Sequence, residues 1–212
     1  MKFLDDNSVF FSETAVLDGL IIRENRLPAE VFRSQMCGFL MLDFDRFQFR
    51  EYFTYLARFV EKVRESRFRF ACLDPDPVAY YYQHFRKYPF AEMLPQASPD
   101  DYVALLRQDP DGSPADALAY RADVIVFYSH SKRWVVYGER ELSLIVVGFQ
   151  DESLVEAFLS SFDRSWLLSA EDAVENILPL VFGDPRNMTT RENIGKTLVL
   201  NYGGQRSVIQ KS

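Results

Sequence analysis

Residues 122–149 read ADVIVFYSHSKRWVVYGERELSLIVVGF, three apolar segments separated by two short polar joints. The segments at 122–128, 133–137 and 142–149 are rich in Val, Ile, Phe, Tyr and Trp, which favour β-strands. The joints SHSK and GERE have the length of hairpin connections. This pattern predicts an antiparallel meander over about 122–149, and its apolar density predicts at least one covered face.

The flanking sequence predicts helices and further strands. Apolar side chains recur at the i, i+3, i+4, i+7 spacing of an amphipathic helix over about 47–66. Apolar runs predict strands at 35–42 and 68–73, with shorter ones at 8–12 and 19–23. Other helices are predicted at 78–87 behind a cap at Asp76, at about 98–107, at 151–162 and at 169–182. We therefore predict an α+β fold, an antiparallel-rich sheet with helices packed on one face.

One globular domain is predicted over 1–182, followed by a polar, basic extension over 183–212. The chain has 212 residues, of which 48% are hydrophobic, so it can bury a core without disulfides or metal ions. The extension turns polar after Gly183 and holds one apolar island at 197–200. We interpret that island as a strand added late or as part of a partly disordered segment.

The net charge of the chain limits the classes of molecule that it is expected to bind. The chain carries a net charge of −7, and its last 30 residues have three more basic than acidic side chains, so residues 1–182 carry −10. Binding to nucleic acid needs clustered Lys and Arg, and a membrane span needs about 20 apolar residues, so we expect neither partner. An acidic body suits a basic protein, although such a charge also simply keeps a protein soluble.

The two cysteines, Cys37 and Cys72, each lie in an apolar run without a spacing motif. We interpret both as free thiols that behave as small core residues, and we predict a reducing, cytoplasmic compartment. No cofactor is predicted.

Two of the predicted strands end in Asp-x-Asp, at Asp43 and Asp45 and again at Asp74 and Asp76. The stretch FLMLDFD resembles the first motif of haloacid dehalogenase-type phosphatases, which implies a nucleophilic Asp43, a general acid Asp45 and bound Mg²⁺. The Thr or Val of that motif is Phe47 here, and no second acidic pair or lysine follows. A metal-dependent phosphoryl-transfer or hydrolytic enzyme is therefore the alternative function, with all four aspartates holding the metal. Strand-end aspartates also form turns and helix caps, which we favour.

Aromatic residues crowd the segment 80–90, where three tyrosines are consecutive. Positions on a helix are about 100° apart, so three consecutive rings cannot all face a core. At least one ring should reach the surface as an interface anchor, unless the hydroxyl groups rest at the margin of the core.

The second hairpin, WVVYGERELSL at 134–144, is predicted to turn at Gly138 with the charges of Glu139 and Arg140 outside. It resembles the Trp-x-[Ile/Val]-[Tyr/Trp]-[Gly/Ala]-[Asp/Glu]-Arg hairpin of bacterial immunity proteins of polymorphic toxin systems. The resemblance implies a non-enzymatic protein that binds and blocks a toxin, through an acidic face. The predicted partner-binding residues are Tyr80, Tyr81, Tyr82, Tyr88, Trp134, Glu139 and Arg140.

Overall fold

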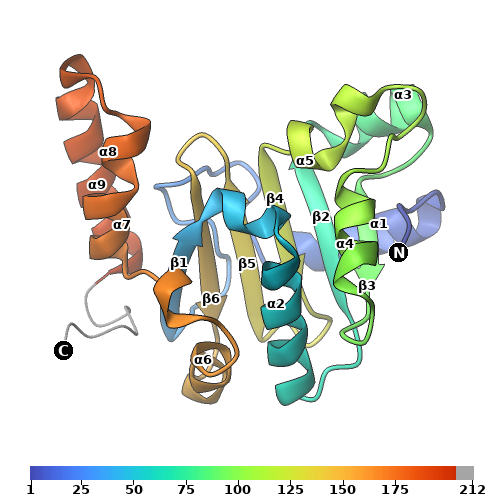
Figure 1. Cartoon of the computed structure of the whole chain (residues 1–212), viewed down its shortest axis with the longest axis horizontal. Helices are drawn as coiled ribbons and strands as arrows, with labels where there is room; N and C mark the ends of the chain where they lie inside the picture. Colours follow the sequence, from blue (N-terminus) through green and yellow to red (C-terminus); the bar gives the residue numbers. More distant parts are fainter. Residues whose placement is uncertain (204–212) are drawn as a thin grey trace.

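The computed structural model describes residues 1–203, and a six-stranded sheet forms its centre (Figure 1). The order of strands is β1-β6-β5-β4-β2-β3, and every neighbouring pair is antiparallel. Strands β4, β5 and β6 lie side by side, which confirms the meander and the α+β class. The strands are β1 (Gly38–Asp43), β2 (Phe68–Asp74), β3 (Phe90–Met93), β4 (Val124–Tyr128), β5 (Trp134–Glu139) and β6 (Leu144–Phe149).

Helices and short turns of helix connect the strands. In chain order they are α1 (Asn7–Asp18), η1 (Phe44–Gln48), α2 (Arg50–Lys62), η2 (Pro77–Tyr82), α3 (Gln83–Phe85), α4 (Pro99–Leu106), η3 (Pro114–Asp116), α5 (Leu118–Arg121), α6 (Glu152–Leu159), η4 (Arg164–Trp166), α7 (Ala170–Asn176), α8 (Leu178–Val181), η5 (Pro185–Asn187) and α9 (Met188–Tyr202). The predicted helices at 47–66, 98–107 and 151–162 are present as α2, α4 and α6. The helix predicted at 169–182 is divided into α7 and α8.

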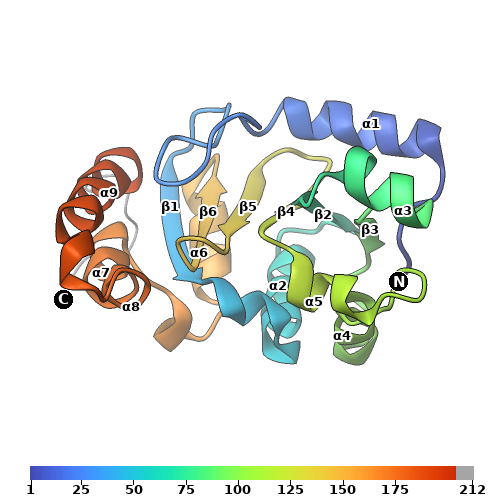
Figure 2. The same cartoon turned by 90° about the horizontal axis from the view of Figure 1, so that it is seen from above.

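Both faces of the sheet are buried, because side chains alternate between them along each strand. In β4, Ile125 and Phe127 join a core with α2, α4 and α6, whereas Val124, Val126 and Tyr128 join a second core. Helix α1 and the irregular segment 20–36 form most of the cover over this second core (Figure 2). Helices α2, α4 and α6 thus lie on one face, as expected, but α1, α7, α8 and α9 contribute buried side chains to the second core. Helices therefore pack on both faces and not on one, because both faces of the central strands are apolar.

The N-terminal segment differs from the prediction, because residues 8–12 lie in α1 and not in a strand. The Asp6 carboxylate caps this helix and accepts hydrogen bonds from the N–H groups of Ser8 and Val9 at 2.7 and 3.0 Å. These bonds satisfy two donors that a helix start otherwise leaves without partners. In place of a strand at 19–23, Ile21 forms one isolated bridge with Phe32.

The C-terminal part of the described chain also differs, since the apolar island at 197–200 lies in helix α9 and not in a strand. Leu198 and Tyr202 are buried against the second core. The Tyr202 hydroxyl donates to the carbonyl of Ala29 at 2.6 Å and accepts the N–H of Val31 at 3.0 Å. Helix α9 is therefore tied to the N-terminal segment. Residues 204–212 of the predicted extension lie outside the described residues.

The two cysteines have different environments. Cys72 is buried in β2, as predicted, but the side chain of Cys37 is exposed. Its backbone N–H donates to the carbonyl of Phe149 at 2.8 Å and so continues the β1–β6 pairing by one residue. The prediction of a buried Cys37 was wrong, because the apolar run that contains it begins before the strand does.

Candidate interaction surface

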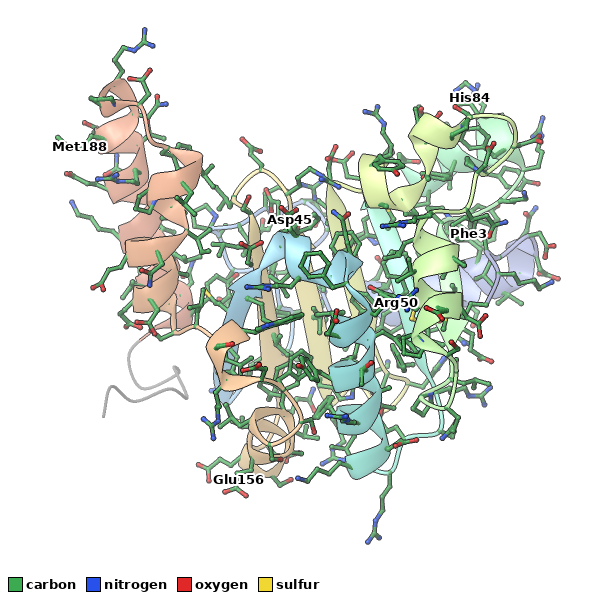
Figure 3. The ribbon with its side chains drawn as sticks, in the orientation of Figure 1. Phe3, Asp45, Arg50, His84, Glu156 and Met188 are labelled. Atoms are coloured by element: carbon green, nitrogen blue, oxygen red, sulfur yellow. The ribbon has the colours of Figure 1, made fainter. Side chains whose placement is uncertain are left out.

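Carboxylates from several separate segments meet at one end of the sheet. The pairing register places Asp43 opposite Leu144, Leu144 opposite Glu139, Glu139 opposite Val124, and Val124 opposite Asp74, so these residues form one row across five strands. Asp45 lies beyond this row, at the end of the sheet (Figure 3). We call this region the sheet-end surface, and its charged residues are Arg26, Asp43, Asp45, Asp74, Asp76, Asp123, Glu139, Arg140 and Glu141.

A cavity of about 330 Å³ opens at the centre of the sheet-end surface, lined by Arg26, Asp74, Asp123, Val124, Glu139, Arg140 and Glu141. The lining residues form two ion pairs, Arg26 with Asp74 at 3.3 Å and Arg140 with Asp123 at 3.1 Å. The Arg140 guanidinium also donates to the carbonyl of Ala122 at 2.9 Å and stacks over the ring of Phe44. The lining is therefore charged and ordered, and its carboxylates outnumber its guanidinium groups.

Glu139 is buried, contrary to the prediction that its charge lies outside the hairpin. It belongs to β5, and its carboxylate accepts the N–H of Leu27 at 2.8 Å. Burial raises the pKa of Glu139 above its ordinary value, although the Leu27 N–H and the charge of Arg26 oppose this effect. The turn is at 140–143 and not at Gly138, which lies inside β5 between the side chains of Ile125 and Ile145.

Two of the four aspartates of the alternative enzyme site cap short helices, and Asp74 pairs with Arg26. The Asp43 carboxylate accepts the N–H of Asp45 at 2.8 Å and caps η1. The Asp76 carboxylate accepts the N–H groups of Val78 and Ala79 at 2.8 and 2.6 Å and caps η2, as predicted. Within residues 1–203, no group of three or more His, Cys, Asp or Glu residues is placed to hold a metal ion.

The three consecutive tyrosines have different environments. Tyr81 is completely buried, and its hydroxyl donates to the carbonyl of Asp116. Tyr80 is half-buried, and its hydroxyl donates to the Asp116 carboxylate at 2.5 Å. Tyr82 is also half-buried and stacks on Tyr88 with ring centroids 4.6 Å apart. Tyr80 and Tyr82 thus reach the surface, as the spacing predicts for at least one ring.

Tyr88 and Trp134 are core residues. Tyr88 stacks between Tyr82 and Phe10, and the two centroid distances are 4.6 and 3.7 Å. Trp134 is fully buried, and its indole N–H donates to the Glu65 carboxylate at 3.2 Å. A partner cannot reach Tyr81, Tyr88 or Trp134 in this conformation. Among the seven predicted partner-binding residues, Tyr80, Tyr82 and Arg140 are the ones with substantial exposed surface.

Sequence reasoning did not single out Tyr120, whose side chain is 66% exposed in helix α5. Its neighbour Arg121 lies over the Tyr80 ring, and Asp123 follows two residues later on the sheet-end surface. The segment between Pro110 and Ala122 has no apolar periodicity, so no local pattern predicts that this ring is exposed. Tyr80 and Tyr120 extend the sheet-end surface toward α3 and α5.

No family model matches this chain, and comparison with curated proteins and with solved structures gives no significant match. None of the helices within residues 1–203 combines the length and the hydrophobicity that a membrane span requires.

Proposed function

We propose that this protein binds another protein, of net basic charge, through the sheet-end surface, and that it is an immunity-type protein that neutralises a toxin. The observation that carries the proposal is the gathering of seven carboxylates at one end of the sheet, with two arginines among them. Carboxylates held by short caps and ion pairs need little reordering when a partner binds, which lowers the entropic cost of association.

Shape and composition support the same surface. Helices α8 and α9 on one side, and α3 and α5 on the other, extend beyond the end of the sheet and flank the β5–β6 turn (Figure 1). Tyr80, Tyr120 and Arg140 provide the residue types that are enriched among interface hot spots. An acidic surface of this kind also accelerates the encounter with a basic protein.

The proposal that the partner is a toxin rests on the acidic surface and also on the resemblance of the hairpin at 134–144 to that of immunity proteins. We propose that the protein acts in the cytoplasm, because both of its cysteines are free thiols. The alternative of a metal-dependent phosphoryl-transfer or hydrolytic enzyme has less support, because Asp43 and Asp76 are engaged as caps. Calorimetric titration with Mg²⁺ and Mn²⁺ tests it, and saturable binding of either ion would favour the enzyme.

The decisive experiment measures binding between the purified protein and the products of the genes adjacent to its own. We expect a basic partner with a tight, saturable interaction, and co-expression should protect cells if that partner is toxic. A double variant, Asp45→Lys with Glu141→Lys, should weaken binding at least tenfold, because both side chains are exposed on the sheet-end surface.

The matched control is Glu152→Lys with Glu156→Lys, which makes the same charge change at two exposed positions of α6, and Glu156 lies at the opposite end of the molecule from Asp45 (Figure 3). It should leave affinity nearly unchanged. Steering by charge also predicts that the association rate falls tenfold or more from low to high salt. The proposal fails if no adjacent gene product binds, or if both variants weaken binding equally.

A further inference from the structure

A second surface, made of aromatic rings and guanidinium groups, lies where η1, α2 and η4 meet. We call it the aromatic–arginine patch, and its residues are Arg46, Phe49, Tyr55, Arg58, Arg164 and Trp166. Trp166 is half-buried, with its ring centroid 5.3 Å from that of Tyr55 and 6.3 Å from that of Phe49. The Phe49 side chain is 46% exposed, so large apolar rings reach solvent here.

Two guanidinium groups of the patch, those of Arg46 and Arg58, lie over aromatic rings and not against carboxylates. The Arg46 guanidinium lies 4.5 Å from the Trp166 ring centroid, and that of Arg58 lies 5.9 Å from the Tyr55 centroid. Among the described residues, neither arginine forms a salt bridge, and the exposed Arg164 forms none either. Asp163, which is within electrostatic range of Arg46, already accepts hydrogen bonds from Ser165.

Several other arginines near the sheet, in contrast, are paired with carboxylates. Arg26, Arg69 and Arg140 each face a carboxylate within 3.3 Å, and Arg50, next to the patch, pairs with Asp100 at 2.7 Å. Two guanidinium groups that lie over rings and form no salt bridge, with the exposed Arg164 close by in sequence, therefore concentrate positive charge on an acidic protein. Arginines stacked on rings are preorganised, so they lose less entropy when a carboxylate binds.

We propose that the aromatic–arginine patch binds an acidic segment of a protein, one that also places an apolar side chain against the Trp166 ring. Carboxylates of that segment pair with Arg46, Arg58 and Arg164 in charge-assisted hydrogen bonds. Trp, Tyr and Arg dominate interface hot spots, and the patch contains all three. A protein segment fits better than a nucleic acid, because Asp45, Glu51 and Asp163 are close in sequence to the patch residues and limit its positive charge to a small area. Such an area can pair with a few carboxylates but not with a continuous polyphosphate chain.

The inference is independent of the proposed function. The sheet-end surface is acidic and suits a basic partner, whereas the patch has the opposite charge and suits an acidic one. Failure to find a basic partner among adjacent gene products leaves the patch untouched, because its test uses other probes and other variants.

The test starts with a displayed library of random 12-residue peptides, selected on the full-length protein and counter-selected on a variant carrying Arg46→Gln, Arg58→Gln and Trp166→Ala. We expect enriched peptides to contain several Asp or Glu residues and at least one large apolar residue. A synthetic peptide of the enriched sequence is then titrated while tryptophan emission is recorded. Trp166 is the accessible indole and Trp134 is buried, so binding should shift the emission of the wild type and not of Trp166→Phe.

The arginine variants separate a specific site from general charge attraction. Arg46→Gln with Arg58→Gln should weaken peptide binding at least tenfold, whereas Arg33→Gln, an exposed arginine in the segment 20–36, should leave it unchanged. Thermal unfolding of each variant shows whether the fold is intact, and Arg58→Gln alone provides the milder change. The proposal is overturned if acidic residues are not enriched, or if the variants bind as well as the wild type. It is also overturned if an oligonucleotide displaces the peptide, or if the patch proves to be a contact between two copies of this chain by sedimentation.

Discussion

The carboxylate of Glu13 and the guanidinium of Arg69 form an ion pair inside the protein, with Nε 2.8 Å from Oε1 and with side chains only 5% and 12% exposed. Glu13 belongs to α1 and Arg69 to β2, so the pair ties the N-terminal helix to the sheet. The same carboxylate accepts the hydroxyl of Tyr128, and Arg69 also contacts Glu92. A fully hydrogen-bonded network of this kind fixes the position of α1 on the second core.

Removal of one partner of this pair should be costly. We expect Glu13→Ala to lower the free energy of unfolding by about 3–5 kcal/mol, because it removes a buried carboxylate that both pairs with Arg69 and accepts the Tyr128 hydroxyl. Urea unfolding followed by circular dichroism measures this. Arg67→Gln is the control: Arg67 also contacts Glu92 but is largely exposed, so the change should cost less than about 1 kcal/mol. Equal losses in the two variants would contradict the assigned role of Glu13.

Glu139 should make stability depend on pH in an unusual direction. Burial raises its pKa in the folded protein, so the folded state holds the proton more strongly than the unfolded state does. Its favourable contribution to stability is therefore complete below the unfolded pKa and is lost as the pH rises through the folded one. Glu139→Gln should stabilise the protein at pH 7, and the gain should shrink toward pH 4.

The Glu139 prediction is checked by urea unfolding between pH 4 and pH 8. The glutamine oxygen can still accept the Leu27 N–H, so the variant removes the charge and keeps the hydrogen bond. A variant that is destabilised by the same amount at every pH would contradict it.

Truncation of Tyr81 and of Tyr80 to alanine should affect stability and partner binding differently. Tyr81→Ala is expected to cost about 3–5 kcal/mol of stability, since it empties a fully buried site. Tyr80→Ala leaves a half-buried position, so its cost in stability should be smaller and its effect on partner binding larger, on the order of 2 kcal/mol if it is a hot spot. Unfolding and binding measured on both variants test this. A Tyr80 variant that binds normally would remove this ring from the interface.

Gly138→Ala should destabilise the meander. A Cβ atom at this position would lie 2.8 Å from Cγ1 of Ile125 and 3.1 Å from Cγ1 of Ile145. Overpacking of this kind costs about 1–3 kcal/mol, because the neighbouring side chains must leave their preferred rotamers. Thermal unfolding checks the prediction. An unchanged midpoint would mean that the two isoleucines move apart without strain.

Asp43→Ala should distinguish the binding function from the enzymatic alternative. The variant loses the cap of η1, which should cost about 1 kcal/mol, and should keep most of its partner affinity. A nucleophile or metal ligand would instead be indispensable. Complete loss of function in a folded Asp43→Ala protein would therefore favour the hypothesis of a phosphatase.

The elements whose patterns are local could be predicted from the amino-acid sequence. The meander follows from three apolar segments joined by four-residue connections, and α2 follows from the spacing of its apolar side chains. The caps at Asp76 and Ser98 also have local signals, because a side-chain oxygen reaches N–H groups two or three residues ahead. These local patterns are sufficient to predict the α+β fold class, and they place several carboxylates at the ends of strands.

Contacts between distant segments set the burial and the partners of those side chains. Glu139 alternates with its neighbours along β5, yet the cover supplied by segment 20–36 buries it, and nothing within the hairpin encodes that contact. Trp134 looked like an interface anchor, but Phe59 and Glu65 from α2 and the following turn enclose it. The aromatic–arginine patch also joins residues that are more than 100 positions apart. Burial and charge pairing depend on contacts between distant segments, and such contacts leave no periodic signal in either segment alone.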